Sequence, residues 1–408
     1  MVSTELVLSA FLAISLLASI VSRRTRTPYT IVLVLTGIVL AAASTPELAA
    51  VGQAFQGLRS GGIFVGLILP PLLFESMMSI RTDEFRAVSR PAIALATGGV
   101  VVATIVVGLI LWGFAGLPAY TAFLFAALIA PTDVATVLEI FNRTAVPSQL
   151  ATLLETESVF NDATGITILT VVLSGFLAST SGLALVGAVG DGVFLFGGGV
   201  LVGLGVAWGA RQLQREIQDS LSQIVLTMAA VYGSYGLATA LGVSGLIAVA
   251  VTGLFYGNTV LFRIDRKDVE EATREFWGIL AFFANTVAFL FIGFSTNILS
   301  LGGSVAFILV AYCVVMLSRA VTVYPILSIP NMVTGGVPNS WKNVAFFGGM
   351  RGALSIALVA SLPSSLPAYS TVVNMTFGVA VISILLQGPL MTAYARRSFG
   401  TQQYPSVP

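Results

Sequence analysis

Long apolar runs dominate this chain and restrict what it can fold into. Of its 408 residues, 56% are hydrophobic and 9% are charged, whereas a soluble domain carries roughly 25% charged residues. A helix that crosses about 30 Å of hydrocarbon needs roughly 20 apolar residues. The apolar runs between charged residues and Pro, Gly or Asn breaks therefore predict an all-α polytopic membrane protein with about 13 transmembrane helices. The predicted spans are 3–21, 28–44, 61–80, 91–113, 119–140, 149–177, 182–209, 220–240, 243–258, 276–298, 303–325, 341–362 and 369–394.

The basic residues predict how these spans are oriented. Most of the 19 Lys and Arg residues fall on alternate loops, beginning with Arg23 and Arg24 after the first span, whereas Arg59 falls on the other side. Loops rich in Lys and Arg stay in the cytoplasm. We therefore expect a protein of the cell (inner) membrane with its N-terminus outside, its C-terminus in the cytoplasm and a short cytoplasmic tail over residues 396–408.

Several classes of function are excluded by residues that the chain lacks. It has no histidine and one cysteine, Cys313, which removes the commonest metal ligand, the usual general base and any disulfide framework. A net charge of +1 gives no electrostatic footprint for nucleic acid. No GxxxxGK[ST] loop is present, which argues against an ATP-driven pump. We expect a secondary transporter surrounded by lipid, with no nucleic-acid partner, no enzymatic activity and no cofactor.

Ionisable side chains inside the spans are the strongest functional signal, because each costs about a few kcal/mol to place in hydrocarbon. Glu155 lies nearer the cytoplasmic end of its span, so reaching the interface explains it as well as a functional role does. The ionisable residues within spans are Glu75, Asp133, Glu155, Glu157, Asp162, Arg319 and Arg351.

Span 5 contains Pro131, Thr132 and Asp133 near its middle. Proline removes an intrahelical hydrogen bond and kinks or breaks a helix, which frees carbonyl groups at that depth. Freed carbonyls, a threonine hydroxyl and a carboxylate are oxygen ligands suited to a hard cation. The segment therefore predicts a binding site for a monovalent cation within the membrane.

Span 6 adds a second set of polar side chains. Glu157 and Asn161, and likewise Ser158 and Asp162, are four residues apart and so share neighbouring faces of a helix. A carboxylate in a partly desolvated cavity can alternate between holding a proton and holding a cation, and without histidine a carboxylate has to carry the proton. Asn161 hydrogen-bonds but carries no proton, so one charge exchanges for one charge. Asp162 is the predicted carrier, and the predicted transport is electroneutral.

Two arginines inside spans supply fixed positive charge, since arginine stays protonated. We expect Arg319 to form a buried ion pair with Glu157 that holds the geometry of the site. Arg351 lies among Gly348, Gly349 and Gly352, which loosen the helix. Span 12 is therefore the predicted second broken helix, crossing the break in span 5.

Glu75 follows Pro70 and Pro71 in span 3, and Arg81 comes shortly after it. The double proline predicts a kink that turns Glu75 toward the cation site as a further ligand. A funnel open to the cytoplasm is the alternative position for this carboxylate.

Four segments of the sequence together resemble the monovalent cation:proton antiporters of the NhaP/NHE type. They are APTD at 130–133, ETESVFNDATGI at 155–166, SRA at 318–320 and GGMRGALSIALVASLP at 348–363. The resemblance implies a membrane domain over residues 1–395 built from inverted repeats, with two crossing unwound helices in spans 5 and 12. It also implies a core domain of spans 3–6 and 10–13, a dimerisation scaffold of the remaining spans, and a homodimer.

The resemblance assigns roles to the same residues. Asp162 would bind the proton and the ion with Asn161 as its partner, and Asp133, Ser158 and Thr132 would complete a Na⁺ site to which Glu75 contributes. Glu157 would pair with Arg319, and Arg351 would sit near the break in span 12. The implied activity is electroneutral exchange of Na⁺ or Li⁺ for a proton by alternating access.

Other transport classes remain as alternatives to Na⁺/H⁺ exchange. They are a K⁺/H⁺ antiporter, since ion preference depends on fine cavity geometry, and a cation-coupled symporter for an organic solute. A cation channel has no need of a titratable Asp162 beside buried arginines, and an intramembrane protease lacks its Ser/His pair or glycine-aspartate motif.

Overall fold

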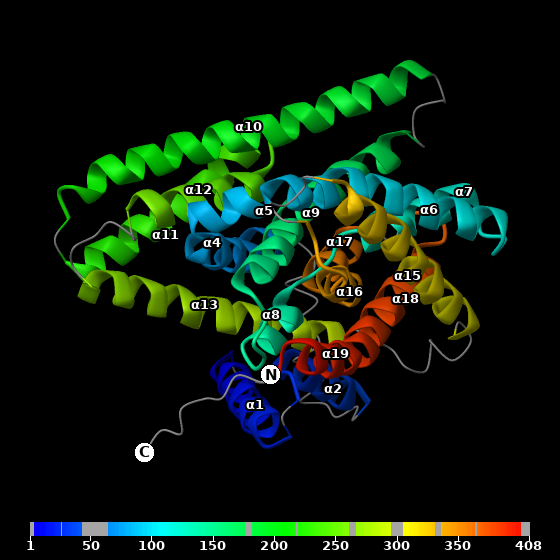
Figure 1. Cartoon of the computed structure of the whole chain (residues 1–408), viewed down its shortest axis with the longest axis horizontal. Coiled ribbons are helices and arrows are strands. Elements are labelled where there is room, and N and C mark those ends of the chain that lie inside the picture. Colours follow the sequence, from blue (N-terminus) through cyan, green and yellow to red (C-terminus); the bar gives the residue numbers. More distant parts are fainter. Residues whose placement is uncertain are drawn as a thin grey trace.

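The computed structural model describes residues 4–25, 27–42, 64–175, 182–217, 219–260, 267–294, 305–330, 336–363 and 365–400. Over these ranges the chain is helical apart from connecting loops and one isolated β-bridge, as Figure 1 shows. Arg59 and residues 401–408 of the predicted tail lie outside the described residues. The first half contains α1 (Thr4–Thr25), α2 (Tyr29–Ala42), the π-helical turn η1 (Phe64–Ile68), α4 (Leu69–Ser79), α5 (Thr82–Ala94), η2 (Leu95–Gly99), α6 (Val100–Gly113), α7 (Ala119–Ile129), α8 (Ala135–Phe141) and α9 (Ser148–Gly175). The second half contains α10 (Gly182–Gln214), α11 (Ser220–Ala240), α12 (Gly245–Thr259), α13 (Lys267–Phe294), α15 (Val305–Ser328), α16 (Asn339–Phe347), α17 (Ala353–Ser361), α18 (Tyr369–Ile382), η5 (Ser383–Gln387) and α19 (Gly388–Phe399).

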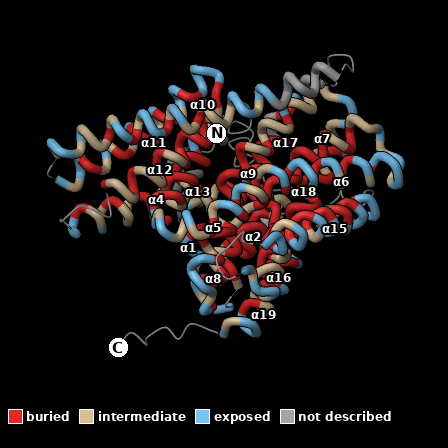
Figure 2. The backbone as a smooth tube through the Cα atoms, turned by 45° about the horizontal axis from the view of Figure 1, so that its top comes forward, coloured by how far each residue is buried: buried red, intermediate tan, exposed pale blue. Residues whose placement is uncertain are grey.

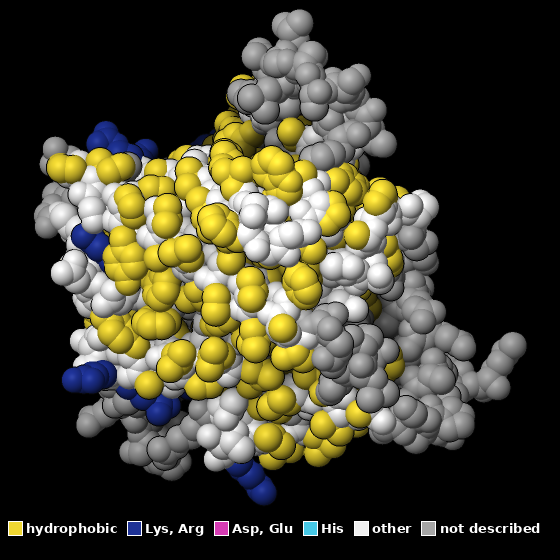
Figure 3. Space-filling view, turned by 90° about the vertical axis from the view of Figure 1, so that its right-hand side faces the viewer, with side chains coloured by type: hydrophobic (Ala, Val, Ile, Leu, Met, Phe, Trp, Pro, Cys, Tyr) yellow, Lys and Arg dark blue, Asp and Glu magenta, His cyan; other side chains and the backbone are white. Residues whose placement is uncertain are grey.

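Among the described residues, six helical segments are long and apolar enough to cross a membrane, and four shorter helices are apolar. Hydrophobic side chains cover most of the described face in Figure 3, with Lys and Arg along its margin. A surface of this kind suits hydrocarbon, because soluble proteins rarely expose such large apolar patches. The prediction of an all-helical, multi-pass membrane protein is confirmed, and the number of spans stays a prediction.

Two helices begin earlier than the apolar runs indicated. Spans expected from residues 91 and 276 belong to helices that start at Thr82 and Lys267. The extra turns are charged; in α13, for example, Arg274 Nε donates to Glu270 Oε1 at 2.9 Å, four residues away. A hydropathy pattern detects only the apolar part of a helix. Backbone hydrogen bonds and ion pairs between residues four apart continue the helix through its charged turns.

Two of the described spans are interrupted near their middle. The first changes from α7 to α8 through residues 130–134, and the second changes from α16 to α17 through residues 348–352. The two interruptions meet, because the backbone N–H of Asp133 donates to the carbonyl oxygen of Met350 at 2.8 Å. The predicted crossing of two unwound helices in spans 5 and 12 is therefore present.

The remaining helices surround this crossing. In Figure 2, α9, α17 and α18 run through the buried centre, whereas α1 and α10 carry exposed residues along their outer sides. The long helix α10 packs beside α12 and α11. A group formed by α6, α7, α9 and α15 packs around the interruptions.

A second group of helices packs together beside the interruptions. Helix α4 packs mainly against α12 and α13, and α13 packs against α2. The close approach of α2 and α13 depends on two glycines, since a Cβ on Gly37 would lie 2.4 Å from Leu290 O and one on Gly293 would lie 2.1 Å from Val34 O. The predicted division into a core and a dimerisation scaffold, with spans 3 and 10 in the core, stays a prediction.

Candidate functional site

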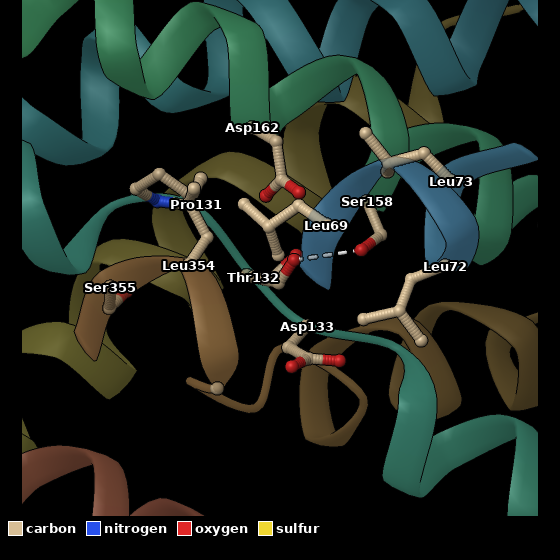
Figure 4. A pocket seen from close by; sticks show the side chains of 11 residues that line it. Leu69, Leu72, Leu73, Pro131, Thr132, Asp133, Ser158, Asp162, Leu354 and Ser355 are labelled. Atoms are coloured by element: carbon tan, nitrogen blue, oxygen red, sulfur yellow. Dashed lines mark hydrogen bonds between the residues drawn. The ribbon is translucent and has the colours of Figure 1, made fainter. Parts of the chain in front are cut away.

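A small cavity lies where the interrupted helices cross. Its volume is about 50 Å³, which exceeds the roughly 10–15 Å³ that a cavity needs to hold one water molecule, so a small ion fits inside it. Figure 4 shows its side chains converging from α4, α9, α17 and the first interruption. The residues that line it are Leu69, Leu72, Leu73, Pro131, Thr132, Asp133, Ser158, Asp162, Gly352, Leu354 and Ser355.

The polar groups of the cavity come from the first interruption and from α9. Ser158 Oγ donates to the carbonyl oxygen of Thr132 at 2.9 Å, and Asn161 Nδ2 donates to Thr132 Oγ1 at 2.7 Å. Asp162 is 8% exposed and points from α9 toward Thr132 in Figure 4. Of the six residues predicted to form the site, four therefore line one cavity: Thr132, Asp133, Ser158 and Asp162. Asn161 does not line it but binds the Thr132 hydroxyl.

Asp133 occupies the extended segment that follows Pro131. Its Oδ1 accepts from the backbone N–H of Ala135 at 2.8 Å, which satisfies one of the free N–H groups at the start of α8. Proline at 131 has no N–H to give to a helix, so the chain leaves helical geometry here. Gly165 on α9 lets that helix lie against the break, because a Cβ there would be 2.1 Å from Pro131 Cγ.

Gly352 brings the second interruption against Asp133. A Cβ built on Gly352 would lie 1.8 Å from Asp133 Oδ2, so any larger residue displaces the carboxylate. The sequence interpretation treated this glycine only as a residue that loosens the helix. The structure shows that its missing side chain makes room for a proposed ligand.

Glu157 and Arg319 form a buried ion pair beside the cavity. Arg319 Nη1 donates to Glu157 Oε1 and Nη2 donates to Oε2 at 3.0 Å, and the two residues are 1% and 6% exposed. Arg319 also donates to the carbonyl oxygen of Ala345 from Nε at 3.2 Å and from Nη2 at 2.8 Å. The pair therefore joins α9 and α15 to the end of α16 as well as balancing charge.

Arg351 is 2% exposed and reaches across to the other interruption. Its Nη1 donates to the carbonyl oxygens of Ala130 at 2.7 Å and Pro131 at 3.0 Å. These are carbonyls that the end of α7 leaves without an intrahelical partner, and a cation is favoured at a helix C-terminus. Arg351 thus holds the two interruptions together through backbone oxygens.

Glu75 and Glu155 lie outside the residues that line the cavity. Ser76, the neighbour of Glu75 on α4, donates a hydrogen bond from Oγ to Glu155 Oε1. Thr152 Oγ1 donates to Glu84 Oε2 at 3.3 Å on the same side of α9. The structure places Glu75 with this second group of acids, and its role as a cation ligand stays a prediction.

Sequence reasoning missed two polar groups that hold elements in place. Glu139 accepts from the backbone N–H groups of Tyr29 and Thr30 at the start of α2 and pairs with Arg143 at 3.0 Å. Ser383, which accepts from the backbone N–H of Arg351, and its partner Gln387 were also missed. Their four-residue spacing in an apolar span was the available signal.

Comparisons with known proteins agree with this architecture. Residues 10–397 match the family described as sodium/hydrogen exchanger, transmembrane. The chain is 32% identical over 396 residues to the Na(+)/H(+) antiporter ApNhaP of Aphanothece halophytica, which covers 95% of this chain and 72% of that protein. It is 31% identical over 356 residues to the Na(+)/H(+) antiporter NhaP of Pseudomonas aeruginosa, which covers 82% of this chain and 80% of that protein.

The fold is similar to that of a solved antiporter. The structure of the sodium proton antiporter MjNhaP1 from Methanocaldococcus jannaschii superposes with a TM-score of 0.75 at 22% sequence identity, covering 96% of this chain and 98% of that chain. The family match spans nearly the whole chain, including both interrupted helices and α9. This chain therefore belongs to the sodium/hydrogen exchanger family of transmembrane transporters.

Proposed function

We propose that the protein exchanges one Na⁺ or Li⁺ ion for one proton across the cell membrane, with both ions competing for Asp162. The observation that carries this proposal is a buried aspartate lining a cavity of about 50 Å³ together with Thr132, Asp133 and Ser158. The relatives named as Na(+)/H(+) antiporters support the choice of ions. Asn161, which carries no proton, supports one-for-one exchange.

The proposed cycle alternates between two occupied states of one site. In one state, the carboxylates of Asp162 and Asp133 and the oxygens of Thr132 and Ser158 bind a cation that has lost most of its water. In the other state, Asp162 holds a proton. Carrying an empty, charged site through hydrocarbon is costly, so access changes from one side to the other only when Asp162 is neutralised.

The fixed groups around the site keep its geometry through this cycle. Arg319 binds Glu157 and the carbonyl oxygen of Ala345, and Arg351 binds the carbonyl oxygens of Ala130 and Pro131. No described residue at the cavity other than Asp133 and Asp162 is ionisable. Proton coupling in this proposal therefore depends on the cavity carboxylates, with Asp162 the more buried of the two.

Purified protein in liposomes with a pH-sensitive dye inside tests the proposal. An imposed proton gradient should collapse when Na⁺ or Li⁺ is added, because cation entry at Asp162 drives proton exit. A response to K⁺ alone would replace this function with K⁺/H⁺ exchange. A response that needs an added organic solute together with Na⁺ would instead identify a symporter, and no response to any cation would overturn antiport.

The exchange is expected to be electroneutral. The rate of Na⁺-driven proton flux should stay the same, within about 20%, when a K⁺ gradient with valinomycin imposes a membrane potential. One charge moving without compensation would couple to the potential by about 2.3 kcal/mol per 100 mV, which would change the rate severalfold. A rate that follows the potential would show that unequal numbers of protons and cations are exchanged.

Gly352→Ala tests whether the close approach of the second interruption sets the position of Asp133. We expect the Na⁺ exchange rate to fall at least about tenfold, because the new methyl group must push away the Asp133 carboxylate. Gly205→Ala on α10 is the control, since a Cβ there meets nothing within 4 Å. Full activity of Gly352→Ala would mean that Asp133 is not a ligand in its present position.

The proposal extends to membrane orientation and assembly. We place the N-terminus outside and the C-terminus in the cytoplasm of the inner membrane, supported by the distribution of Arg and Lys on alternate loops. We also place two copies in a homodimer, as the resemblance to the family implies. Cross-linking in native membranes tests the dimer, and a single band of monomer size would contradict it.

A further inference from the structure

The last membrane segment contains a buried polar pair that the proposed exchange does not use. Ser383 and Gln387 begin and end the π-helical turn η5 between α18 and α19, and both are 1% exposed. Buried polar groups are costly unless they are hydrogen-bonded, and π-helical turns are frequent at functional sites. The contacts of this pair indicate what it does.

The pair connects the second interruption to a neighbouring helix. The backbone N–H of Arg351 donates to Ser383 Oγ at 2.9 Å, and Ser383 Oγ donates to Gln387 Oε1 at 2.7 Å. Gln387 Nε2 then donates to the sulfur of Met316 on α15, one turn before Arg319. The backbone at Arg351 is thus anchored by a chain of hydrogen bonds that runs away from the cavity.

A serine also binds the backbone of the first interruption, although there it donates the hydrogen bond and does not accept it. Ser158 on α9 bonds the carbonyl oxygen of Thr132, and Asp162 follows four residues later and lines the cavity. Ser383 bonds the second interruption, and Gln387 follows four residues later. Inverted repeats produce such correspondences between the two halves of a transporter. The second half therefore has an amide where the first half has the carboxylate.

Residues 350–352, which surround the anchored N–H of Arg351, all contact the first interruption. Met350 O accepts from the N–H of Asp133 at 2.8 Å. Arg351 Nη1 donates to Ala130 O and Pro131 O, and Gly352 lies against the Asp133 carboxylate. A shift of the backbone at Arg351 would therefore move both Asp133 and the carbonyls of the first interruption.

We propose that Ser383 and Gln387 are positioning residues for cation binding, acting through residues 350–352, and that they form the neutral counterpart of Ser158 and Asp162. This proposal rests on the proposed exchange and deepens it. In the first half, Ser158 and Asp162 bind the ion. In the second half, Ser383 and Gln387 fix the position of residues 350–352, which contact the ion site.

Three variants test the pair: Ser383→Ala, Gln387→Met and the double variant. We expect each single variant to raise the KM for Na⁺ about tenfold while kcat changes less than twofold, because the ligands are displaced but Asp162 still exchanges its proton. The double variant should be no worse than the more damaging single variant, since the two residues act as one hydrogen-bonded chain. Thr376→Val is the control, because Thr376 is equally buried in α18 but bonds only Val372 O of its own helix.

Na⁺ binding is measured separately, as the Na⁺-dependent rise in melting temperature of detergent-purified protein. Wild-type protein that binds Na⁺ but does not exchange it would overturn the proposed exchange, and the binding curves of the variants would still test the positioning role. Variants with the same Na⁺ affinity and KM as Thr376→Val would overturn the positioning role. Effects of the two single variants that add in the double variant would also contradict the hydrogen-bonded chain. If Ser383→Ala does not fold, Gln387→Met decides the outcome.

Discussion

Asp162→Asn is expected to abolish Na⁺-driven proton flux, with a loss of at least about 100-fold. The amide has nearly the size of the carboxylate but carries no charge and takes up no proton. Residue 162 can then no longer exchange a proton for a cation. Flux is measured with the pH-sensitive dye in liposomes that contain equal amounts of folded protein. The loss should appear at every Na⁺ concentration, because competition at the site has been removed.

A matched control separates this effect from a general loss of acidic charge. Asp191→Asn removes an aspartate that is exposed on α10, and we expect it to leave the exchange rate within twofold of wild type. Flux retained by Asp162→Asn would move the proton-carrying role to another carboxylate. Asp133→Asn would then be the next variant to measure, since Asp133 is the other ionisable residue on the cavity wall.

Glu157→Gln is expected to destabilise the protein by about 3–5 kcal/mol. The substitution keeps one acceptor oxygen at residue 157 but removes the negative charge that balances the buried Arg319 guanidinium, and an uncompensated buried charge is strongly unfavourable. The apparent melting temperature of detergent-purified protein should fall sharply. Asp83→Asn is the control, because its pair with Arg81 is 75% and 62% exposed on the two side chains and exposed pairs contribute about 0–1 kcal/mol.

The double variant Glu157→Met/Arg319→Met distinguishes stability from function at this pair. Replacing a buried ion pair by well-packed hydrophobic residues of similar volume is often neutral for stability, so we expect the melting temperature to recover most of the loss. Exchange that stays low in the recovered protein would show that the charges also set the properties of the cavity. A single variant as stable as wild type would mean that neutral oxygen acceptors, including Ala345 O, satisfy Arg319 without a carboxylate.

Much of this protein follows from local pattern in the chain. Apolar runs predict its helices, and Pro131 predicts the first interruption, because a missing N–H acts within one turn. The four-residue spacing of Ser158 and Asp162 puts both on one face of α9, where the structure has them lining one cavity. Charge scarcity alone singles out Glu157 and Arg319, since buried charges are rare unless they are paired.

Other features depend on which segments meet across the fold. The bond between Asp133 and Met350 joins residues far apart in sequence, and Arg351 reaches backbone carbonyls, although charge alone suggests a carboxylate. Glu75 lies with Ser76 and Glu155 outside the cavity lining, a position its distance from Arg81 left open.

The chain by itself thus determined its membrane helices, their breaks and the identity of the scarce charged groups, since hydropathy and helical periodicity are local properties. The tertiary structure alone decided that Gly352 faces Asp133 and that Ser383 holds the backbone of Arg351. Contacts of this kind come from the packing of whole helices against one another. A glycine or a serine carries no local mark of the partner that packing brings to it.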